Sequence, residues 1–247
     1  MRLAAIADVH GNLVALEAVL ADLRARSPDL LVNLGDCVTS PLWPRETLDL
    51  LDALALPTVR GNHDRWVAES APARGDVASV EHARAALDDA RRARLGALPP
   101  RLALAEGVLL VHGTPASDTE YLLEEKVDGR LALARPATLA ERLAGEPAAL
   151  VLCGHSHHQH AALAPGGRLV ANPGAVGAPR YAGDAEPLAV EAGSPHARYA
   201  VATRRGGRWS VEMIALDYDW APVVARARAN GREDWVRGFL AGVGAPG

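Results

Sequence analysis

Five short apolar runs in this chain each end at a cluster of residues that can bind a metal ion. The clusters combine carboxylate, imidazole and amide side chains with glycine: Asp8-Val9-His10, Gly35-Asp36, Gly61-Asn62-His63-Asp64, His112-Gly113 and Gly154-His155-Ser156-His157-His158. Such ligands suit cations of intermediate hardness, for example Mn²⁺, Fe²⁺ or Zn²⁺. An isolated Asp-x-His or Gly-Asp pair is common by chance. All five clusters in order, each after an apolar run, favour a metal site.

The apolar runs predict the elements that position these clusters: strands at 2–7, 30–34, 56–59, 108–111 and 149–153. Helices are expected between them at 13–23 and 47–54. Since the carboxyl ends of strands in a βαβ sheet meet at one rim, we expect the clusters to converge there. In an extended segment, alternation would place Asp8 and His10 on one side, and likewise His155 and His157.

The remaining pattern predicts further elements on both sides of the last cluster. A helix is expected over 77–98 before Pro99-Pro100, a hairpin at 102–111 around Glu106-Gly107, and a helix at 137–144. Runs at 168–171, 197–202 and 209–215 predict strands of a second sheet. The Gly-, Pro- and Ala-rich stretch 178–195 lies between strand-like runs, which favours a loop. We therefore expect a single domain over 1–247, with a C-terminal helical tail at about 221–247.

The order of the five blocks resembles the signature of the calcineurin-like metallophosphoesterase superfamily, D-x-H, G-D, G-N-H-[DE], H and G-H-x-H. The phrases at 8–13, 112–115 and 172–177 are similar to those of its small bacterial phosphodiesterase branch. The resemblance implies an α/β (α+β) fold, a two-sheet β-sandwich flanked by helices. It also implies a dinuclear metal site at one edge of that sandwich.

The same resemblance implies a role for each signature residue. Asp8, His10 and His157 would bind one metal, Asn62, His112 and His155 the other, and Asp36 would bridge both. The cofactors are then two divalent ions, Mn²⁺ first, with Fe, Zn²⁺, Ni²⁺ or Mg²⁺ as alternatives. The implied reaction is phosphodiester hydrolysis through attack of a metal-bridging hydroxide on phosphorus, with His63 assisting the leaving group.

Three further side chains are candidates for a role in catalysis or substrate binding, and each also has a purely structural interpretation. Asp64 is placed to orient His63, or is an acid at a helix N-terminus. Asn12 would bind the substrate phosphate or support a ligand, or it caps a helix. Arg180 would reach a substrate phosphate, or it forms a surface salt bridge.

Composition limits the class of partner. With 26 basic and 30 acidic residues the formal net charge is −4, which argues against stable nucleic-acid binding. The apolar N-terminal stretch is too short for a signal peptide, and no run approaches the ~18 apolar residues of a membrane span. Two cysteines without C-x-x-C spacing are typical of a reduced compartment. We expect a cytoplasmic protein acting on a small phosphoester or nucleotide-like substrate, without a membrane partner. Whether it forms a homo-oligomer stays open.

Two other functions remain alternatives. A phosphomonoesterase or protein phosphatase would need the same ligands, so the motifs barely separate it from a phosphodiesterase. A non-catalytic protein-binding scaffold is disfavoured, because every signature position is filled.

Overall fold

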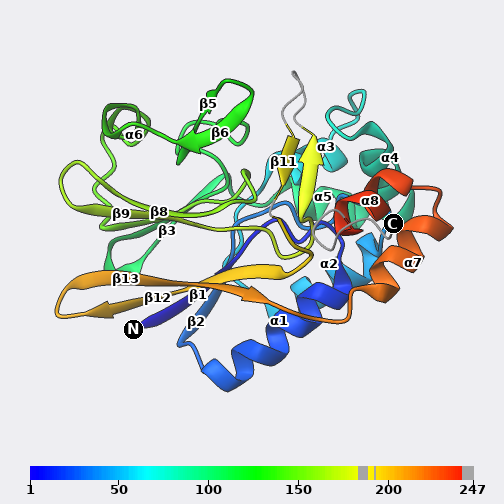
Figure 1. Cartoon of the computed structure of the whole chain (residues 1–247), viewed down its shortest axis with the longest axis horizontal. Helices are drawn as coiled ribbons and strands as arrows, with labels where there is room; N and C mark the ends of the chain where they lie inside the picture. The colour runs from blue at the N-terminus through cyan, green and yellow to red at the C-terminus, as the bar shows by residue number, and fades with distance from the viewer. Residues whose placement is uncertain (183–188, 192, 241–247) are drawn as a thin grey trace.

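Two β-sheets packed face to face form the centre of the structure, a computed structural model that describes residues 1–182, 189–191 and 193–240 (Figure 1). The first sheet has the order β13-β12-β1-β2, with β1 (Arg2–Ile6) parallel to β2 (Leu30–Asn33). Its other strands, β12 (Ala197–Arg205) and β13 (Arg208–Leu216), join β1 in antiparallel fashion.

The second sheet has the order β3-β4-β7-β9-β8. Its three central strands are parallel: β4 (Val108–Val111), β7 (Leu150–Leu152) and β9 (Arg168–Pro173). The antiparallel strands β3 (Arg101–Leu104) and β8 (Gln159–Ala164) form its two edges. Because β1, β2, β4 and β7 all end on the same side, the polar clusters that follow them are brought to one edge of the sandwich.

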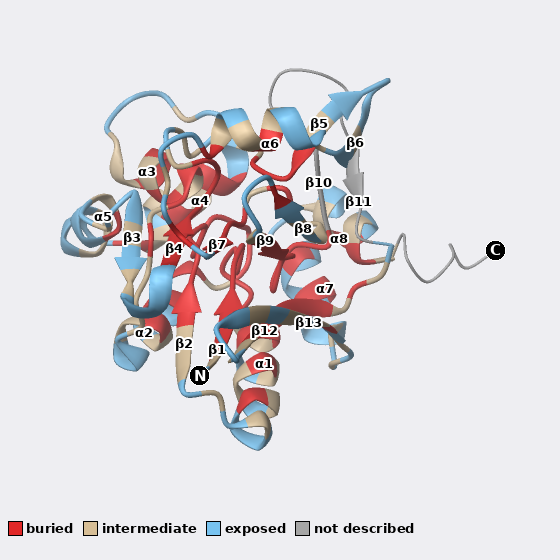
Figure 2. Cartoon of the chain, turned by 90° about the vertical axis from the view of Figure 1, so that its left-hand side faces the viewer, coloured by how far each residue is buried: buried red, intermediate tan, exposed pale blue. Residues whose placement is uncertain are grey.

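Strand alternation divides the core into layers. In β1, Leu3 and Ala5 face the second sheet, whereas Ala4 and Ile6 face α1 (Leu13–Arg26). In β4, Leu110 faces the first sheet, whereas Leu109 packs toward α6 (Pro136–Arg142). Since both faces of these strands are covered, their sequences are continuous apolar runs. Figure 2 shows the buried residues along the central strands.

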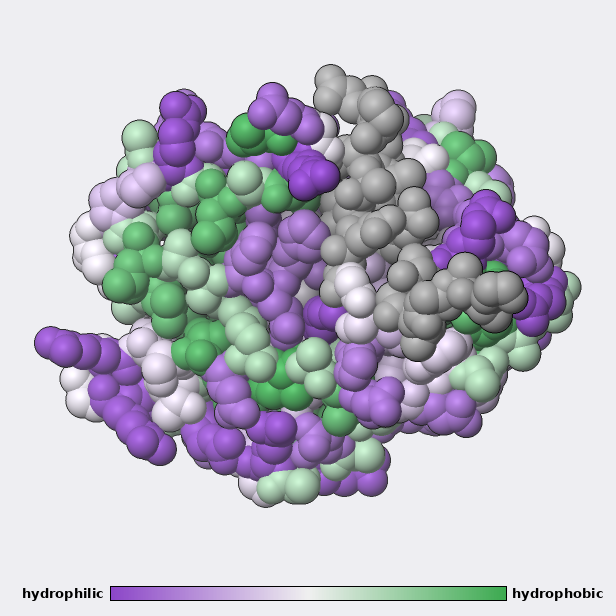
Figure 3. All heavy atoms as spheres, viewed as in Figure 1, coloured by the Kyte–Doolittle hydropathy of each residue, from purple (hydrophilic) through white to green (hydrophobic). Residues whose placement is uncertain are grey.

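Helices and hairpins surround the two sheets. Four helices follow α1 before the second sheet begins: α2 (Pro44–Leu54), α3 (Asn62–Ala68), α4 (Val77–Ala86) and α5 (Asp89–Gly96). The other elements are the 3₁₀ turn η1 (Ala105–Gly107), β5 (Glu124–Val127), β6 (Arg130–Leu133), β10 (Arg180–Ala182), β11 (Ala189–Glu191), α7 (Ala221–Ala229) and α8 (Glu233–Leu240). In space-filling view, hydrophilic side chains gather in the middle of one face, below the β5–β6 hairpin (Figure 3). Within the described ranges, no helix is both long and apolar enough to cross a membrane.

The predicted fold class is confirmed, with local corrections. The helix predicted over 77–98 is two helices, because α4 ends at Ala86 with an extended Leu87 as its C-cap. Asp88 then accepts a hydrogen bond from the Arg91 backbone N–H as the N-cap of α5. The strand predicted at 56–59 is a single β-bridge between Asn33 and Thr58. The runs predicted as one second sheet are divided, since β12 pairs with β1 and β13 with β12 in the first sheet, while β9 pairs with β7 in the second. Residues 241–247 of the expected tail lie outside the described part.

Candidate metal centre

The predicted ligand side chains converge in two groups at the strand ends. Asp8, His10 and His157 form one group, and Asp36, His112 and His155 the other; within each group one ligand atom per residue lies within 4.8 Å of the others. The Asp36 Oδ2 atom is 3.8 Å from His10 Nε2 and 3.3 Å from His112 Nε2, so Asp36 lies between the groups. Asn62 joins the second group, its Oδ1 atom 2.9 Å from His112 Nε2.

Backbone carbonyl groups fix the orientation of three imidazoles. The Nδ1 atoms of His10, His112 and His157 lie 2.9, 2.7 and 3.0 Å from the carbonyl oxygens of Thr39, Leu34 and Ala178 respectively. A carbonyl oxygen only accepts, so Nδ1 carries the proton, and in the neutral ring Nε2 offers its lone pair to the site. Carbonyl partners of this kind are usual behind metal-bound histidines. The sequence motifs contain no signal for these three partners.

Facing lone pairs provide a test of whether a cation fits. The Nε2 atoms of His10 and His157 are 3.2 Å apart, although each ring already donates its Nδ1 proton elsewhere. His112 Nε2 lies 2.9 Å from the acceptor oxygen of Asn62, a position that a proton or a cation between the two atoms stabilises. Acceptors at this distance repel unless a proton or a cation lies between them. The donor set therefore fits divalent cations.

Burial and neighbouring charges set the protonation of the two groups. Burial lowers the pKa of His10 to about 4 and that of His155 to about 3. Burial would raise the pKa of Asp36, but His112 and the other nearby imidazoles outweigh it and hold that pKa well below its usual range. Burial would lower the pKa of His112, but Asp36 outweighs it and raises that pKa to about 10. A cation held at His112 would therefore displace a proton.

Backbone conformation, and not strand alternation, aims most of these side chains. Asp8, His10, Asp36, His155 and His157 all have positive φ angles, between 46° and 70°. The expectation that alternation in an extended segment places each pair on one side is therefore wrong. Left-handed residues other than glycine cost about 1 to 3 kcal/mol each and occur where the surrounding structure enforces them.

Asp64 is the acid in the first turn of α3, the structural alternative predicted for it, and it supports the loop that carries Asp36. Its carboxylate is fully buried and accepts the backbone N–H groups of Asp36 and Cys37, both at 2.8 Å, and of Gly61 at 3.0 Å. No hydrogen bond joins Asp64 to the ring of His63 within the described part of the chain. Burial and the charge of Asp36 raise the pKa of Asp64 to about 6.

Gly61 leaves room for Asp36, which gives a first prediction. A Cβ atom at position 61 would lie 2.5 Å from the backbone nitrogen of Asp36 and 2.8 Å from its Cγ. We expect Gly61→Ala to displace the carboxylate and lower phosphoesterase activity at least about tenfold, because a small misplacement of a catalytic group is costly. The matched control is Gly96→Ala, whose Cβ meets Ala68 at 3.0 Å. Equal activity of both variants would contradict this role of Gly61.

Asn12 is a structural residue, in contrast to its predicted place among substrate-binding residues. It is fully buried, and its Oδ1 atom caps α1 by accepting the Ala15 backbone N–H at 3.1 Å. Its Nδ2 group donates to the Gly177 carbonyl at 3.0 Å and to the Tyr218 hydroxyl at 3.1 Å. Both ends of the amide are thus used within the protein.

We expect Asn12→Ala to lower the free energy of unfolding by about 2 kcal/mol or more, from loss of the cap and of the buried bonds. Urea denaturation of metal-loaded protein measures this. If the Asn12→Ala variant had unchanged stability and a raised KM, Asn12 would bind substrate as the sequence predicted.

His63 lies beside the two groups without belonging to either. Its ring centroid is 5.2 Å from that of His10 and 4.7 Å from that of Trp66. Its backbone N–H donates to Asp36 Oδ1 at 2.9 Å, and its Nδ1 atom has no hydrogen-bond partner within the described residues. The ring therefore borders the site with its hydrogen-bonding capacity unused.

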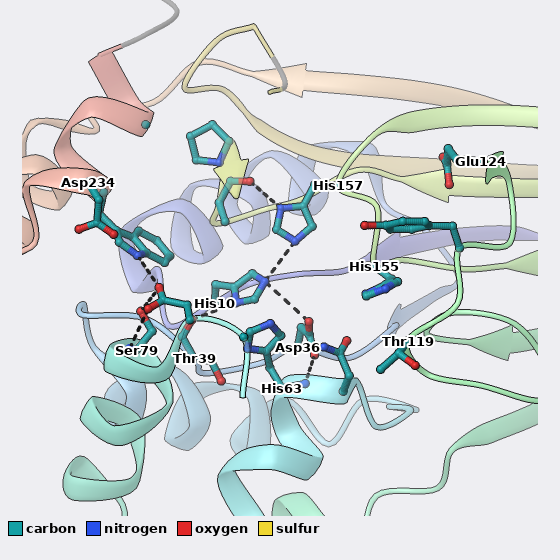
Figure 4. Close-up of a pocket in the computed structure, with 18 of the residues that line it drawn as sticks. His10, Asp36, Thr39, His63, Ser79, Thr119, Glu124, His155, His157 and Asp234 are labelled. Atoms are coloured by element: carbon teal, nitrogen blue, oxygen red, sulfur yellow. Dashed lines mark hydrogen bonds and ion pairs between the residues drawn. The ribbon is translucent and has the colours of Figure 1, made fainter. Parts of the chain in front are cut away.

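A cavity of about 870 Å³ opens over the two groups. Figure 4 shows His10, His63, His155 and His157 around it, with Asp36 at their centre. The ring of Tyr121 stacks on His155 at a centroid distance of 4.9 Å and borders the cavity. The backbone of Arg180 begins β10, and its side chain lies outside the described part.

Comparison with known proteins places this geometry in a family. Residues 1–192 match the calcineurin-like phosphoesterase superfamily domain. The chain belongs to this superfamily. This is a metal-dependent phosphoesterase family, in agreement with the two groups of ligand atoms.

Two solved structures resemble the whole fold of this superfamily member. A metallophosphoesterase from Sphaerobacter thermophilus is 29% identical, with a TM-score of 0.75 over 98% of this chain and 100% of its own. A hypothetical protein from Pyrococcus horikoshii is 20% identical, with a TM-score of 0.74 over 96% of each chain. An uncharacterised protein of Methanocaldococcus jannaschii is 42% identical over 65 residues, and this match spans 26% of the present chain and 27% of that relative's length.

Proposed function

We propose that this chain hydrolyses phosphodiester bonds with the help of two divalent cations. The observation that carries the proposal is the pair of ligand groups on either side of Asp36, with lone pairs that face one another at the bottom of an open cavity. Asp8, His10 and His157 would hold one cation, and Asn62, His112 and His155 the other, with Asp36 shared. We further propose that both cations are Mn²⁺.

When bound, two such cations lower the pKa of water and neutralise charge on the phosphoryl oxygens. The chain's own residues prepare the site for them. Three carbonyl groups orient imidazoles, and Asp64 holds the loop of Asp36. His63 would hold a proton at a ring nitrogen and donate it to the leaving oxygen, since its ring borders the cavity.

The size of the cavity supports a diester. A volume of about 870 Å³ has room for a phosphate with an organic group on each side. The likeness of the phrase at 172–177 to the small phosphodiesterase branch supports the same preference. In the structure, the last residue of this phrase packs against the first ligand loop, because the Gly177 N–H donates to the Asp8 carbonyl at 3.0 Å.

The test uses metal-stripped protein to which Mn²⁺ is returned. We expect bis(p-nitrophenyl) phosphate to be hydrolysed faster than p-nitrophenyl phosphate, and elemental analysis to show two metal ions per chain. Preference for the monoester would overturn the diester assignment. Absence of turnover with both metals bound would overturn the enzymatic function and favour a protein-binding role.

A further inference from the structure

The part of the cavity farther from the predicted metal ligands, here called the outer cavity, has two facing walls. Neither wall contributes a predicted metal ligand. One wall is the β5–β6 hairpin and the other is α8. Figure 4 shows Glu124 of β5 and Asp234 of α8 on opposite sides of the histidine cluster. Lys126, two residues after Glu124, and Arg237, about one turn after Asp234, both line the cavity.

Four acidic side chains on or beside these walls line the cavity and have basic neighbours. Asp76 and Asp234 share Arg232, at 2.7 and 2.6 Å, and Glu120 forms an ion pair with Arg142 at 3.6 Å. Glu124 Oε1 lies 2.9 Å from His160 Nδ1, while its buried Oε2 atom has no hydrogen-bond partner among the described residues. In contrast, Lys126 and Arg237 form no ion pair or hydrogen bond with another described residue. Lys126 and Arg237 are therefore cationic side chains that line the cavity, one on each wall, and no described carboxylate pairs with them.

The wall that carries Arg237 is held in place. Val236 and Phe239 of α8 are buried in a cluster with Leu42. Just before α8, Arg232 bonds to Asp76, and the indole N–H of Trp235 donates to the same carboxylate at 3.2 Å. Arg237 therefore extends from an anchored helix, which lowers the entropic cost of binding an anion there.

We propose that the substrate carries a second anionic group, a phosphate in the part that is not the leaving group, and that Lys126 and Arg237 bind it. This inference depends on the proposed phosphodiesterase function, because the cations holding the scissile phosphate place the rest of the substrate between the two walls. Guanidinium and ammonium groups are the side chains that bind phosphate most strongly. Lys126 and Arg237 would each favour substrates with a second phosphate, a selectivity that the metal site alone does not provide.

The test compares two substrates that differ by one phosphate. Thymidine 5′-(p-nitrophenyl phosphate) and its 3′-phosphorylated derivative release the same p-nitrophenol. We expect kcat/KM to be about three- to tenfold higher for the derivative, mainly through KM, since exposed ion pairs are modest. Lys126→Gln and Arg237→Gln should each reduce this ratio, and the double variant should bring it to about one. Arg130→Gln, on an exposed residue of the same hairpin outside the cavity lining, should keep the full ratio.

A second readout does not depend on turnover. Lys126 is the only lysine of the chain, so an amine reagent such as trinitrobenzenesulfonate modifies it and the N-terminal amine alone. Thymidine 3′,5′-bisphosphate should protect Lys126 in the manganese-loaded protein, and thymidine 5′-monophosphate should not. Peptide mass spectrometry measures the protection.

The outcomes separate this inference from the proposed function. Turnover of bis(p-nitrophenyl) phosphate with a substrate ratio of one and equal protection by both nucleotides would overturn the second-anion site while keeping the phosphodiesterase. No turnover of any diester would overturn the phosphodiesterase and this inference with it. An unchanged ratio in the double variant would assign the preference to residues other than Lys126 and Arg237.

Discussion

Replacing Asp36 with asparagine should remove metal binding and phosphoesterase activity together. The Asp36 carboxylate is buried, and its Oδ2 atom lies 3.8 Å from His10 Nε2 and 3.3 Å from His112 Nε2. The amide removes the one negative charge that both cations would share. We expect activity to fall roughly a thousandfold, equivalent to about 4 kcal/mol of transition-state stabilisation.

The Asp36→Asn variant should still fold, which makes the result interpretable. An asparagine Oδ1 can still accept the His63 backbone N–H, which Asp36 accepts at 2.9 Å. Elemental analysis and bis(p-nitrophenyl) phosphate hydrolysis are the measurements. Asp217→Asn changes the charge equally at an exposed position and should retain both properties. Full metal occupancy in Asp36→Asn would refute the shared-ligand assignment.

Replacing His63 with glutamine should lower turnover and leave the metal content unchanged. The ring borders the cavity next to His10, and its Nδ1 atom has no hydrogen-bond partner in the described structure. Loss of a general acid typically costs about 10²- to 10⁴-fold, so we expect kcat to fall about a hundredfold. Elemental analysis and steady-state kinetics measure the two effects separately.

A series of aryl diesters distinguishes proton donation from simple positioning. Without the donor, the rate should depend more steeply on the pKa of the leaving phenol, because a poor leaving group needs the proton most. The matched control is His82→Gln in α4, which should give the wild-type slope. Equal slopes for wild type and His63→Gln would show that His63 does not donate the proton.

Much of the site was predictable because ligand chemistry and strand order are both local properties of the sequence. The strand at 2–6 is visible as an apolar run, and the polar residues after it mark its carboxyl end. Residue type alone suggests a metal site, and parallel pairing of β1 with β2 and of β4 with β7 brings the clusters together.

The remainder depends on contacts between segments far apart in the chain. Asp64 lies beside the motif histidine in sequence, yet its carboxylate bonds to backbone groups 27 and 28 residues away. The buried environment of Asn12 includes Tyr218, which no local pattern connects to it. The cavity wall formed by α8 likewise depends on apolar packing against Leu42. Periodicity contains no information about such partners.

Five of the candidate ligands have positive φ angles, a backbone region that glycine adopts at a lower energetic cost. Natural selection for folding alone would favour glycine or asparagine there, because both adopt positive φ angles more readily. These five residues therefore lower the free energy of unfolding, but they provide side chains that are suited to binding metal. A descendant that lost its catalytic role would gain stability by replacing these residues. At these five positions the torsion angles of the main chain and the chemistry of the side chains therefore indicate the same site.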